Sequence, residues 1–178
     1  PRLVAQANDD SCGRRRTRHA GMEGPLKAAI LYQTDRPLQI KDIRQDPPKA
    51  GEVRLKVAVS GICASDYHVA KGHVTAMRPL VLGHEAAGTV EGVGSGVSRL
   101  RPGDRCVTSF VSPCGHCRPC RAGSQQLCET NAMAGQAQLD GTTRLHDGDT
   151  DIYQMAKLGS FSEYMVVPQQ ACHPIPDE

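Results

Sequence analysis

The stretch "GEVRLKVAVSGI", Gly51–Ile62, indicates what kind of fold this 178-residue chain adopts. Apolar residues occupy alternate positions along it: Val53, Leu55, Val57 and Val59. Charged residues stand between them: Glu52, Arg54 and Lys56. A period of two is typical of a half-buried β-strand, so we expect the apolar side chains on a buried face and the charged ones on an exposed face.

Shorter strand candidates flank this stretch at residues 27–32, 38–43, 88–93, 105–110 and 161–167. Turn signals separate them, including "DPPKAG", "RPGD" and a glycine run. Several short strands at such spacing favour a sandwich or barrel over βαβ units. Residues 131–158 are rich in Gly, Asp, Thr and Gln, and we expect them to form a long surface excursion. The chain is therefore predicted to be mainly β.

The amino-acid composition limits the classes of protein to which the chain can belong. Hydrophobic residues make up 39% of the chain and aromatic residues only 3%, with no Trp, so a core must be built from Val, Ile, Leu and Ala. This length suits one domain, or one domain with an appended lobe. No apolar run approaches the roughly 18 residues of a membrane helix, and no signal peptide is visible. We expect a cytoplasmic protein with no membrane partner.

The net charge of +2 is unevenly distributed, because residues 1–21 hold five Arg and only two Asp. The segment "CGRRRTRHAG", Cys12–Gly21, could be a nucleic-acid patch or a transit sequence, yet it lacks interleaved aromatic residues. Its composition cannot bury a core, which favours a disordered basic leader over residues 1–21 and a folded domain over residues 22–178. We expect no nucleic-acid partner.

Four cysteines stand close together in "SPCGHCRPCRAGSQQLCET", Ser112–Thr130: Cys114, Cys117, Cys120 and Cys128. As thiolates they can converge on one ion, and nearby Gly and Pro residues supply the tight turns. Four sulfurs close a tetrahedral shell and leave no position for a substrate, which is typical of a structural zinc. The run therefore predicts a structural-zinc lobe at residues 112–130.

Other interpretations of this run fit less well. A disulfide framework is disfavoured because no secretion signal accompanies the eight cysteines of the chain. Four free thiols in a loop would be open to oxidation. An iron-sulfur cluster requires a different spacing at the fourth cysteine, and a nucleic-acid-binding zinc ribbon would pair two separated knuckles.

A second group of metal-ligand residues lies upstream, in "GICASDYH", Gly61–His68, and in "GHEAAGTVEGVGSGV", Gly83–Val97. Cys63, His84 and Glu85 could reach one ion but could not close its shell. Catalytic zinc needs such an incomplete shell, because the substrate oxygen requires a position on the metal. On their own Cys63 and His84 are weak evidence for a metal site, because a lone Cys and a lone His are more often packing residues.

The segment "GHEAAGTVEGVGSGV" fits the signature GHE-x2-G-x5-G-x2-V of the zinc-containing medium-chain alcohol dehydrogenases at every fixed position. "GICASDYH" resembles that family's catalytic-cysteine segment, and the cysteine run resembles its structural-zinc lobe. "RPGDR", "DGTTRL" and "GSFSEYMVV" follow in the family's order. The resemblance is to class III-like or related bacterial enzymes. It implies a GroES-like, partly open β-barrel that carries a structural-zinc lobe.

The resemblance also implies roles for individual residues. By position, Cys63 and His84 resemble catalytic-zinc ligands. Glu85 resembles the neighbouring carboxylate that can approach the ion. Asp66 resembles the carboxylate that orients a ligand histidine. Ser65 and His68 resemble a hydroxyl and an imidazole in a proton relay. The plainer alternative is that Ser65 and Asp66 cap a helix that begins after Cys63, and that His68 is a surface residue.

Two parts of such an enzyme are not found in the sequence. The family's third protein ligand is a cysteine beyond "FSEYMVV", followed by a dinucleotide-binding Rossmann domain, whereas this chain stops at Glu178. Cys106 and Cys172 resemble strand residues instead. The glycines at 92, 94 and 96 lack the third glycine of the cofactor fingerprint. We therefore expect a C-terminally truncated catalytic domain without its cofactor-binding domain.

These expectations define two functional hypotheses. In the first, the chain belongs to an enzyme with one structural and one catalytic zinc. When joined to its cofactor domain, as a homo-oligomer, it would oxidise a primary or secondary alcohol to an aldehyde or ketone with NAD. The fragment itself would be inactive. In the second, the chain is a non-catalytic, zinc-binding GroES-like module that serves binding or assembly.

Overall fold

The computed structural model describes residues 24–176, so the expected leader at residues 1–21 lies outside the described residues. Five strands form a closed barrel in the order β1 (Pro25–Leu31), β2 (Gln39–Gln45), β7 (Leu145–Asp147), β8 (Thr150–Gln154) and β4 (Leu80–Val81). A second sheet has the order β10 (Cys172–Pro174), β6 (Arg105–Thr108), β5 (Ala86–Val93), β3 (Glu52–Ser60) and β9 (Tyr164–Pro168). The mainly β prediction is confirmed.

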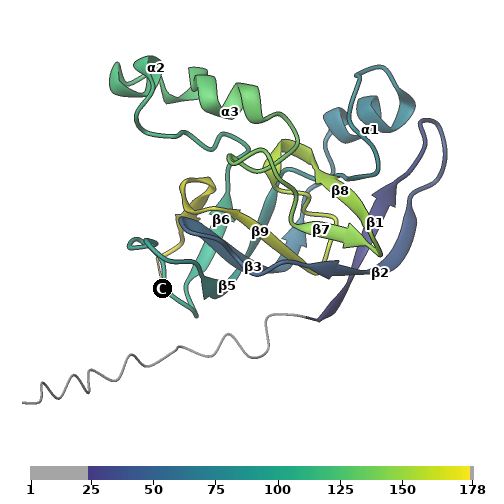
Figure 1. Ribbon diagram of the computed structural model, residues 1–178, viewed down its shortest axis with the longest axis horizontal. Coiled ribbons are helices and arrows are strands. Elements are labelled where there is room, and N and C mark those ends of the chain that lie inside the picture. The colour runs from purple at the N-terminus through teal and green to yellow at the C-terminus, as the bar shows by residue number, and fades with distance from the viewer. Residues whose placement is uncertain (1–23, 177–178) are drawn as a thin grey trace, which may run out of the picture.

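Helices are few and short. α1 (Ala64–Lys71) follows β3, while α2 (Arg118–Arg121) and α3 (Glu129–Ala134) lie between β6 and β7 in the sequence. Three 3₁₀ turns occur at Gln125–Leu127, Met155–Lys157 and Gln169–Ala171. Figure 1 shows α2 and α3 together at one end of the molecule and α1 apart from them. The segment that carries the four lobe cysteines therefore lies apart from α1, the helix that begins just after Cys63.

The strand β3 is central to the second sheet, where it pairs antiparallel with both β5 and β9. Val53 and Leu55 are fully buried, as the alternation predicts. The prediction for the other face is wrong, because Glu52 and Arg54 are also buried. Toward the end of the strand, Val59 is exposed. The first half of β3 is thus buried on both faces, so the burial of its residues does not follow the alternation of apolar and charged side chains.

Arg54 is buried, and its guanidinium group has polar and aromatic partners. Its Nε donates to Gln45 Oε1 at 2.9 Å, and its Nη1 donates to Glu91 Oε2 at 2.9 Å. The guanidinium carbon lies 4.1 Å from the centre of the Tyr164 ring. Such a cation can be buried because hydrogen bonds, an ion pair and an aromatic face replace its lost hydration.

The prediction of a surface excursion at residues 131–158 is wrong. Within it, β7 and β8 complete the barrel, and Leu145 and Ile152 are fully buried in the barrel core. Arg144 is also fully buried, and it donates from Nε and Nη2 to the two carboxylate oxygens of Glu52 at 2.9 and 2.5 Å. This bidentate pair joins residues that lie far apart in the sequence, and it explains how a polar segment enters the interior.

Lys157 connects the lobe helix α3 to the strands. Its side chain is buried, and Nζ donates to the carbonyl oxygens of Asn131 and Gly135 at 2.9 and 3.0 Å. Burial lowers the pKa of this ammonium group. Both acceptors lie in or just after α3, where carbonyl groups lack helical partners and favour a cation.

Candidate metal centres

The helix α1 starts at a point fixed by one buried carboxylate. Asp66 lies in the first turn and accepts a hydrogen bond from the Cys63 backbone N–H at 2.9 Å. It also accepts one from the Gly83 N–H at 2.8 Å. Asp66 thus caps the helix, as the plainer alternative proposes, and joins the start of α1 to the loop that carries His84.

Two glycines allow these segments to approach closely. Gly83 has φ +87°, and a Cβ atom there would lie 2.3 Å from Ser160 Oγ. A Cβ atom on Gly61 would lie 2.5 Å from Glu85 Oε2. Side chains at either position would displace the loop or the carboxylate, so glycine is required for the observed arrangement.

The structure brings Cys63, His84 and Glu85 together, and we name this group the Cys63 centre. One ligand atom of each lies within 4.8 Å of the others. His84 is buried, Cys63 is half-buried and Glu85 is exposed. Two chain segments that are separate in the sequence therefore converge on one point that solvent or a substrate can reach.

The two nitrogens of His84 have different surroundings. Nδ1 lies 3.4 Å from Asp66 Oδ1 and has no hydrogen-bond partner among the described residues, whereas Nε2 lies 4.0 Å from Glu85 Oε1. A carboxylate beside Nδ1 leaves Nε2 as the nitrogen that can bind a metal. Thiolate, imidazole and carboxylate donors suit zinc, so the residues of the Cys63 centre fit this ion.

The other predicted site residues occupy the same helix but do not all meet. Ser65 Oγ lies 3.6 Å from Cys63 Sγ. His68 is exposed, and its Nδ1 lies 3.0 Å from Nδ1 of His73. Sequence reasoning missed His73, and it also missed Phe110, whose ring packs edge-on to His84 with a centroid distance of 6.1 Å.

The four cysteines of the lobe also converge, and we name Cys114, Cys117, Cys120 and Cys128 the lobe centre. Their sulfur atoms all lie within 4.8 Å of one another. Sγ of Cys117 and Sγ of Cys128 are 3.9 Å apart. Tetrahedral zinc with Zn–S bonds of about 2.3 Å requires a sulfur separation of about 3.8 Å, so the spacing fits. All seven cysteines of the described segment are free thiols.

Backbone groups support the sulfur atoms of the lobe centre. Sγ of Cys128 accepts from the N–H groups of Cys114 and Asn131 at 3.2 and 3.4 Å, and Sγ of Cys114 accepts from the Cys117 N–H at 3.3 Å. Hydrogen bonding to Thr130 is the largest effect that lowers the pKa of Cys114, to about 5. These contacts favour the thiolate form of Cys114, whereas burial raises the pKa of Cys120 to about 12.

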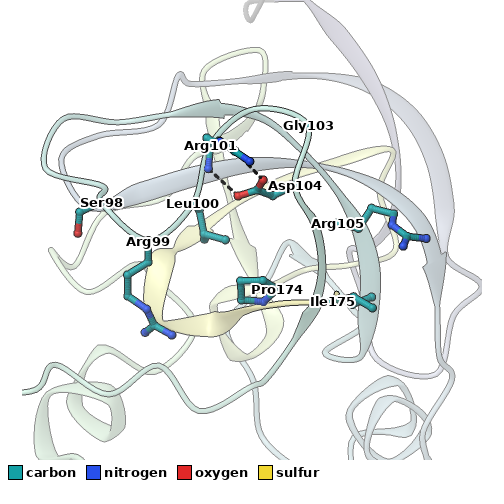
Figure 2. A pocket seen from close by; sticks show the side chains of 9 residues that line it. All are labelled: Ser98, Arg99, Leu100, Arg101, Gly103, Asp104, Arg105, Pro174 and Ile175. Carbon is teal, nitrogen blue, oxygen red and sulfur yellow. Dashed lines mark hydrogen bonds and ion pairs between the residues drawn. The ribbon is translucent and has the colours of Figure 1, made fainter. Parts of the chain in front are cut away.

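A separate cavity of about 360 Å³ lies between the β5–β6 loop and the chain after β10. None of the predicted site residues lines it. Figure 2 shows that the side chains of Arg99, Arg101 and Arg105 point in different directions around it. Arg101 pairs with Asp104 at 3.4 Å. These guanidinium groups do not converge on one ligand position.

Residues 49–177 match the family described as the alcohol dehydrogenase GroES-like domain. The chain belongs to this family. The match includes both metal centres and all of the second sheet. The expected family and the GroES-like fold are confirmed. In the described part of this GroES-like chain, no helix combines the length and the apolar character needed to cross a membrane.

Relatives extend the match to most of the chain. An NDMA-dependent alcohol dehydrogenase of Amycolatopsis methanolica is 39% identical over 152 residues, which is 85% of this chain and 41% of that protein. The structure of an alcohol dehydrogenase zinc-binding domain protein from Burkholderia ambifaria has a TM-score of 0.81 at 30% identity and covers 88% of this chain and 43% of its own.

A third relative is a short chain alcohol dehydrogenase from E. coli CFT073 solved with NADH. It has a TM-score of 0.66 at 35% identity, and the match covers 86% of this chain and 39% of that one. The chain therefore spans about two fifths of the length of these three relatives.

Proposed function

We propose that this chain supplies the zinc-binding catalytic domain of an alcohol dehydrogenase. Joined to a dinucleotide-binding domain, it would oxidise a primary or secondary alcohol to an aldehyde or ketone with NAD. The observation that carries this proposal is the convergence of Cys63, His84 and Glu85 in front of the buried carboxylate of Asp66. We further propose that residues 22–178 form this domain and that residues 112–130 form its metal lobe.

The Cys63 centre would hold the catalytic metal through the thiolate of Cys63 and Nε2 of His84. Zinc bound there would supply Lewis-acid polarisation of the substrate oxygen. Two cysteines and a histidine form the established catalytic zinc shell of alcohol dehydrogenases, and the family resemblance places the further cysteine beyond the strand β9. Asp66 lies 3.4 Å from Nδ1 of His84 and would orient the ring, and Glu85 offers a carboxylate that can approach the same position.

Proton release is the second task of the chain's own residues. The Ser65 hydroxyl lies beside Cys63 and would take the proton of the substrate alcohol. His68 on the same helix is exposed and would pass that proton to solvent. A bound cofactor would supply a hydroxyl group to this proton route.

The hydride acceptor would be a nicotinamide held by the dinucleotide-binding domain. The E. coli relative, solved with NADH, supports this acceptor. The Amycolatopsis relative is named for its dependence on NDMA, so a measurement with both acceptors is informative. We propose a cytoplasmic homo-oligomer for the complete enzyme. The lobe centre would hold a second, structural zinc, because four sulfurs leave no position for a substrate.

The alternative proposal is a zinc-binding module that serves binding or assembly without catalysis. One observation favours it: within residues 24–176, the Cys63 centre gathers only one thiolate, one imidazole and one exposed carboxylate. The lobe centre, in contrast, is a complete four-sulfur set that needs nothing from another domain.

A chimera separates the two proposals. This chain would replace the corresponding segment of the Burkholderia ambifaria protein, and alcohol-dependent NAD reduction would be measured after zinc loading. We expect activity that Cys63→Ala abolishes and that Cys106→Ala, a buried strand thiol outside both centres, retains. A folded, zinc-loaded chimera without activity would favour the module, and an active Cys63→Ala chimera would contradict the proposed catalytic role.

A further inference from the structure

The C-terminus of α1 brings two histidines together. Gly72 adopts the left-handed conformation with φ +80°, the His73 N–H donates to the His68 carbonyl at 2.8 Å, and the Gly72 N–H donates to the Val69 carbonyl at 3.1 Å. This double hydrogen bond is the Schellman motif, which places the residue after the glycine beside the residue five positions earlier. The sequence "HVAKGH" has histidine at both of these positions, His68 and His73.

The two imidazoles face each other at short range. Their Nδ1 atoms form a hydrogen-bond contact at 3.0 Å, and their ring centroids are 5.3 Å apart. The Tyr67 ring packs edge-on to both, with centroid distances of 5.9 Å to His68 and 6.2 Å to His73. Both histidines are exposed. The backbone cap and Tyr67 therefore hold two imidazole nitrogens close together at the surface.

This spacing matches two neighbouring ligands on one metal ion. Two imidazole nitrogens bound at about 2.05 Å and at right angles are about 2.9 Å apart, and right-angled nitrogen ligands are typical of square-planar or tetragonal copper and nickel. We propose that His68 and His73 form a chelate for a divalent transition-metal ion of the nickel or copper type. Small rotations about the ring torsions would direct both lone pairs to the ion, and water would fill its other positions.

The lysine that precedes the cap has an acidic partner. Lys71, the charged residue of the last helical turn, donates from Nζ to Asp35 Oδ1 at 2.6 Å, so its charge is paired. A Cβ atom on Gly72 would lie 2.3 Å from Thr34 Cγ2, so the cap is held against the β1–β2 loop. Ligand type distinguishes this pair from the thiolate-containing centres, because thiolates select zinc whereas imidazole also suits nickel and copper.

The site also suggests a form of control, which rests on the proposed function. His68 is the last member of the proposed proton route. An ion bound to its Nδ1 and to His73 would hold the ring away from that role and would place a positive charge beside the route. Bound metal would therefore slow alcohol oxidation without occupying the Cys63 centre.

The binding test needs no enzymatic activity, so its failure is distinct from failure of the proposed function. The 178-residue chain is loaded with zinc under reducing conditions and is then titrated with Ni²⁺, while amide NMR spectra are recorded. We expect paramagnetic broadening centred on residues 68–74. Loss of an outer partner of a metal site costs about 10- to 100-fold in affinity, so loss of a ligand in His68→Asn or His73→Asn should weaken Ni²⁺ binding by at least about tenfold.

His173→Asn is the matched control, because His173 is an exposed histidine outside all three groups. This variant should bind Ni²⁺ at residues 68–74 as the native chain does. Broadening centred elsewhere in the native chain would overturn the proposal, and so would unchanged binding in His73→Asn. Because asparagine is tolerated beside a helix cap, unchanged chemical shifts in the rest of the spectrum will show that each variant has folded.

Discussion

The lobe centre and the Cys63 centre are assembled over very different distances in the sequence. The four lobe cysteines lie within residues 114–128, and turns and backbone N–H groups of the same segment position their sulfurs. The Cys63 centre requires β3, α1 and the β4–β5 loop to meet through Asp66. A local set can form with its metal alone, whereas the second set depends on the whole fold.

The largest effect should follow from breaking the lobe centre. Structural zinc binding in small domains is folding free energy, on the order of 10 kcal/mol or more, so Cys114→Ser should cost several kcal/mol and expose the lobe to proteolysis. His84→Ala should leave the melting temperature nearly unchanged, because the fold positions the Cys63 centre rather than the reverse. Thermal denaturation and limited proteolysis of the two variants measure this difference. Equal losses of melting temperature would contradict the division of roles.

Long-range assembly can be tested at the buried pair of Arg144 and Glu52. Removing one partner of a buried ion pair leaves an uncompensated charge, so Arg144→Ala should lower the free energy of unfolding by about 3 to 5 kcal/mol. The exposed pair of Arg101 and Asp104 provides the control, since Arg101→Ala should cost less than about 1 kcal/mol. Urea denaturation gives both values. A similar small loss in both variants would show that residues 131–158 do not stabilise the barrel.

Asp66 links the two segments of the Cys63 centre, and its removal should affect metal affinity more than stability. Asp66→Asn keeps the shape but removes the charge beside His84 Nδ1, so zinc affinity of this centre should fall about 10- to 100-fold. The lobe centre should keep its zinc. Competition with a chromophoric chelator resolves the two affinities, and parallel weakening of both centres would show that Asp66 acts through global stability alone.

The smallest expected effect is the contribution of Asp140 to stability and its loss at low pH. Burial acts to raise the pKa of Asp140, but hydrogen bonds from Lys49, Thr142 and Arg144 outweigh it and hold this pKa well below its usual range. A depressed folded-state pKa gives stability that is present above the ordinary value of about 3.9 and is lost as the pH falls further. Asp140→Asn should therefore be less stable than the native chain at neutral pH, by about 1 kcal/mol because the carboxylate is partly exposed. Urea denaturation over a pH series should show this difference closing in acid, and a constant difference would contradict it.

Features encoded by local spacing were predictable from the sequence. The alternation in β3 locates a central strand, and the intervals between the lobe cysteines define a metal set without knowledge of the fold. The segments β7 and β8 were missed because their polar composition resembles a loop. Only the long-range partner of Arg144 shows that this charge can be buried, and a single sequence does not reveal that partner.

The same reasoning explains two further errors, one in the central strand and one in a candidate site. Glu52 and Arg54 were assigned to an exposed face because their partners, Arg144 and Glu91, cannot be read from β3 itself. His73 was missed although a local signal was present. The glycine of "HVAKGH" predicts a helix C-cap, and that cap places the two histidines side by side.

Metal stoichiometry tests the account most directly. The chain, purified under reducing conditions and dialysed against a weak chelator, is analysed for zinc together with Cys114→Ser and Cys63→Ala. We predict that the native chain and Cys63→Ala each retain one zinc, that Cys114→Ser retains none, and that a second zinc binds the native chain only weakly. Absence of zinc, iron with visible absorption, or a tightly held zinc in Cys114→Ser would contradict the assignment of the two centres.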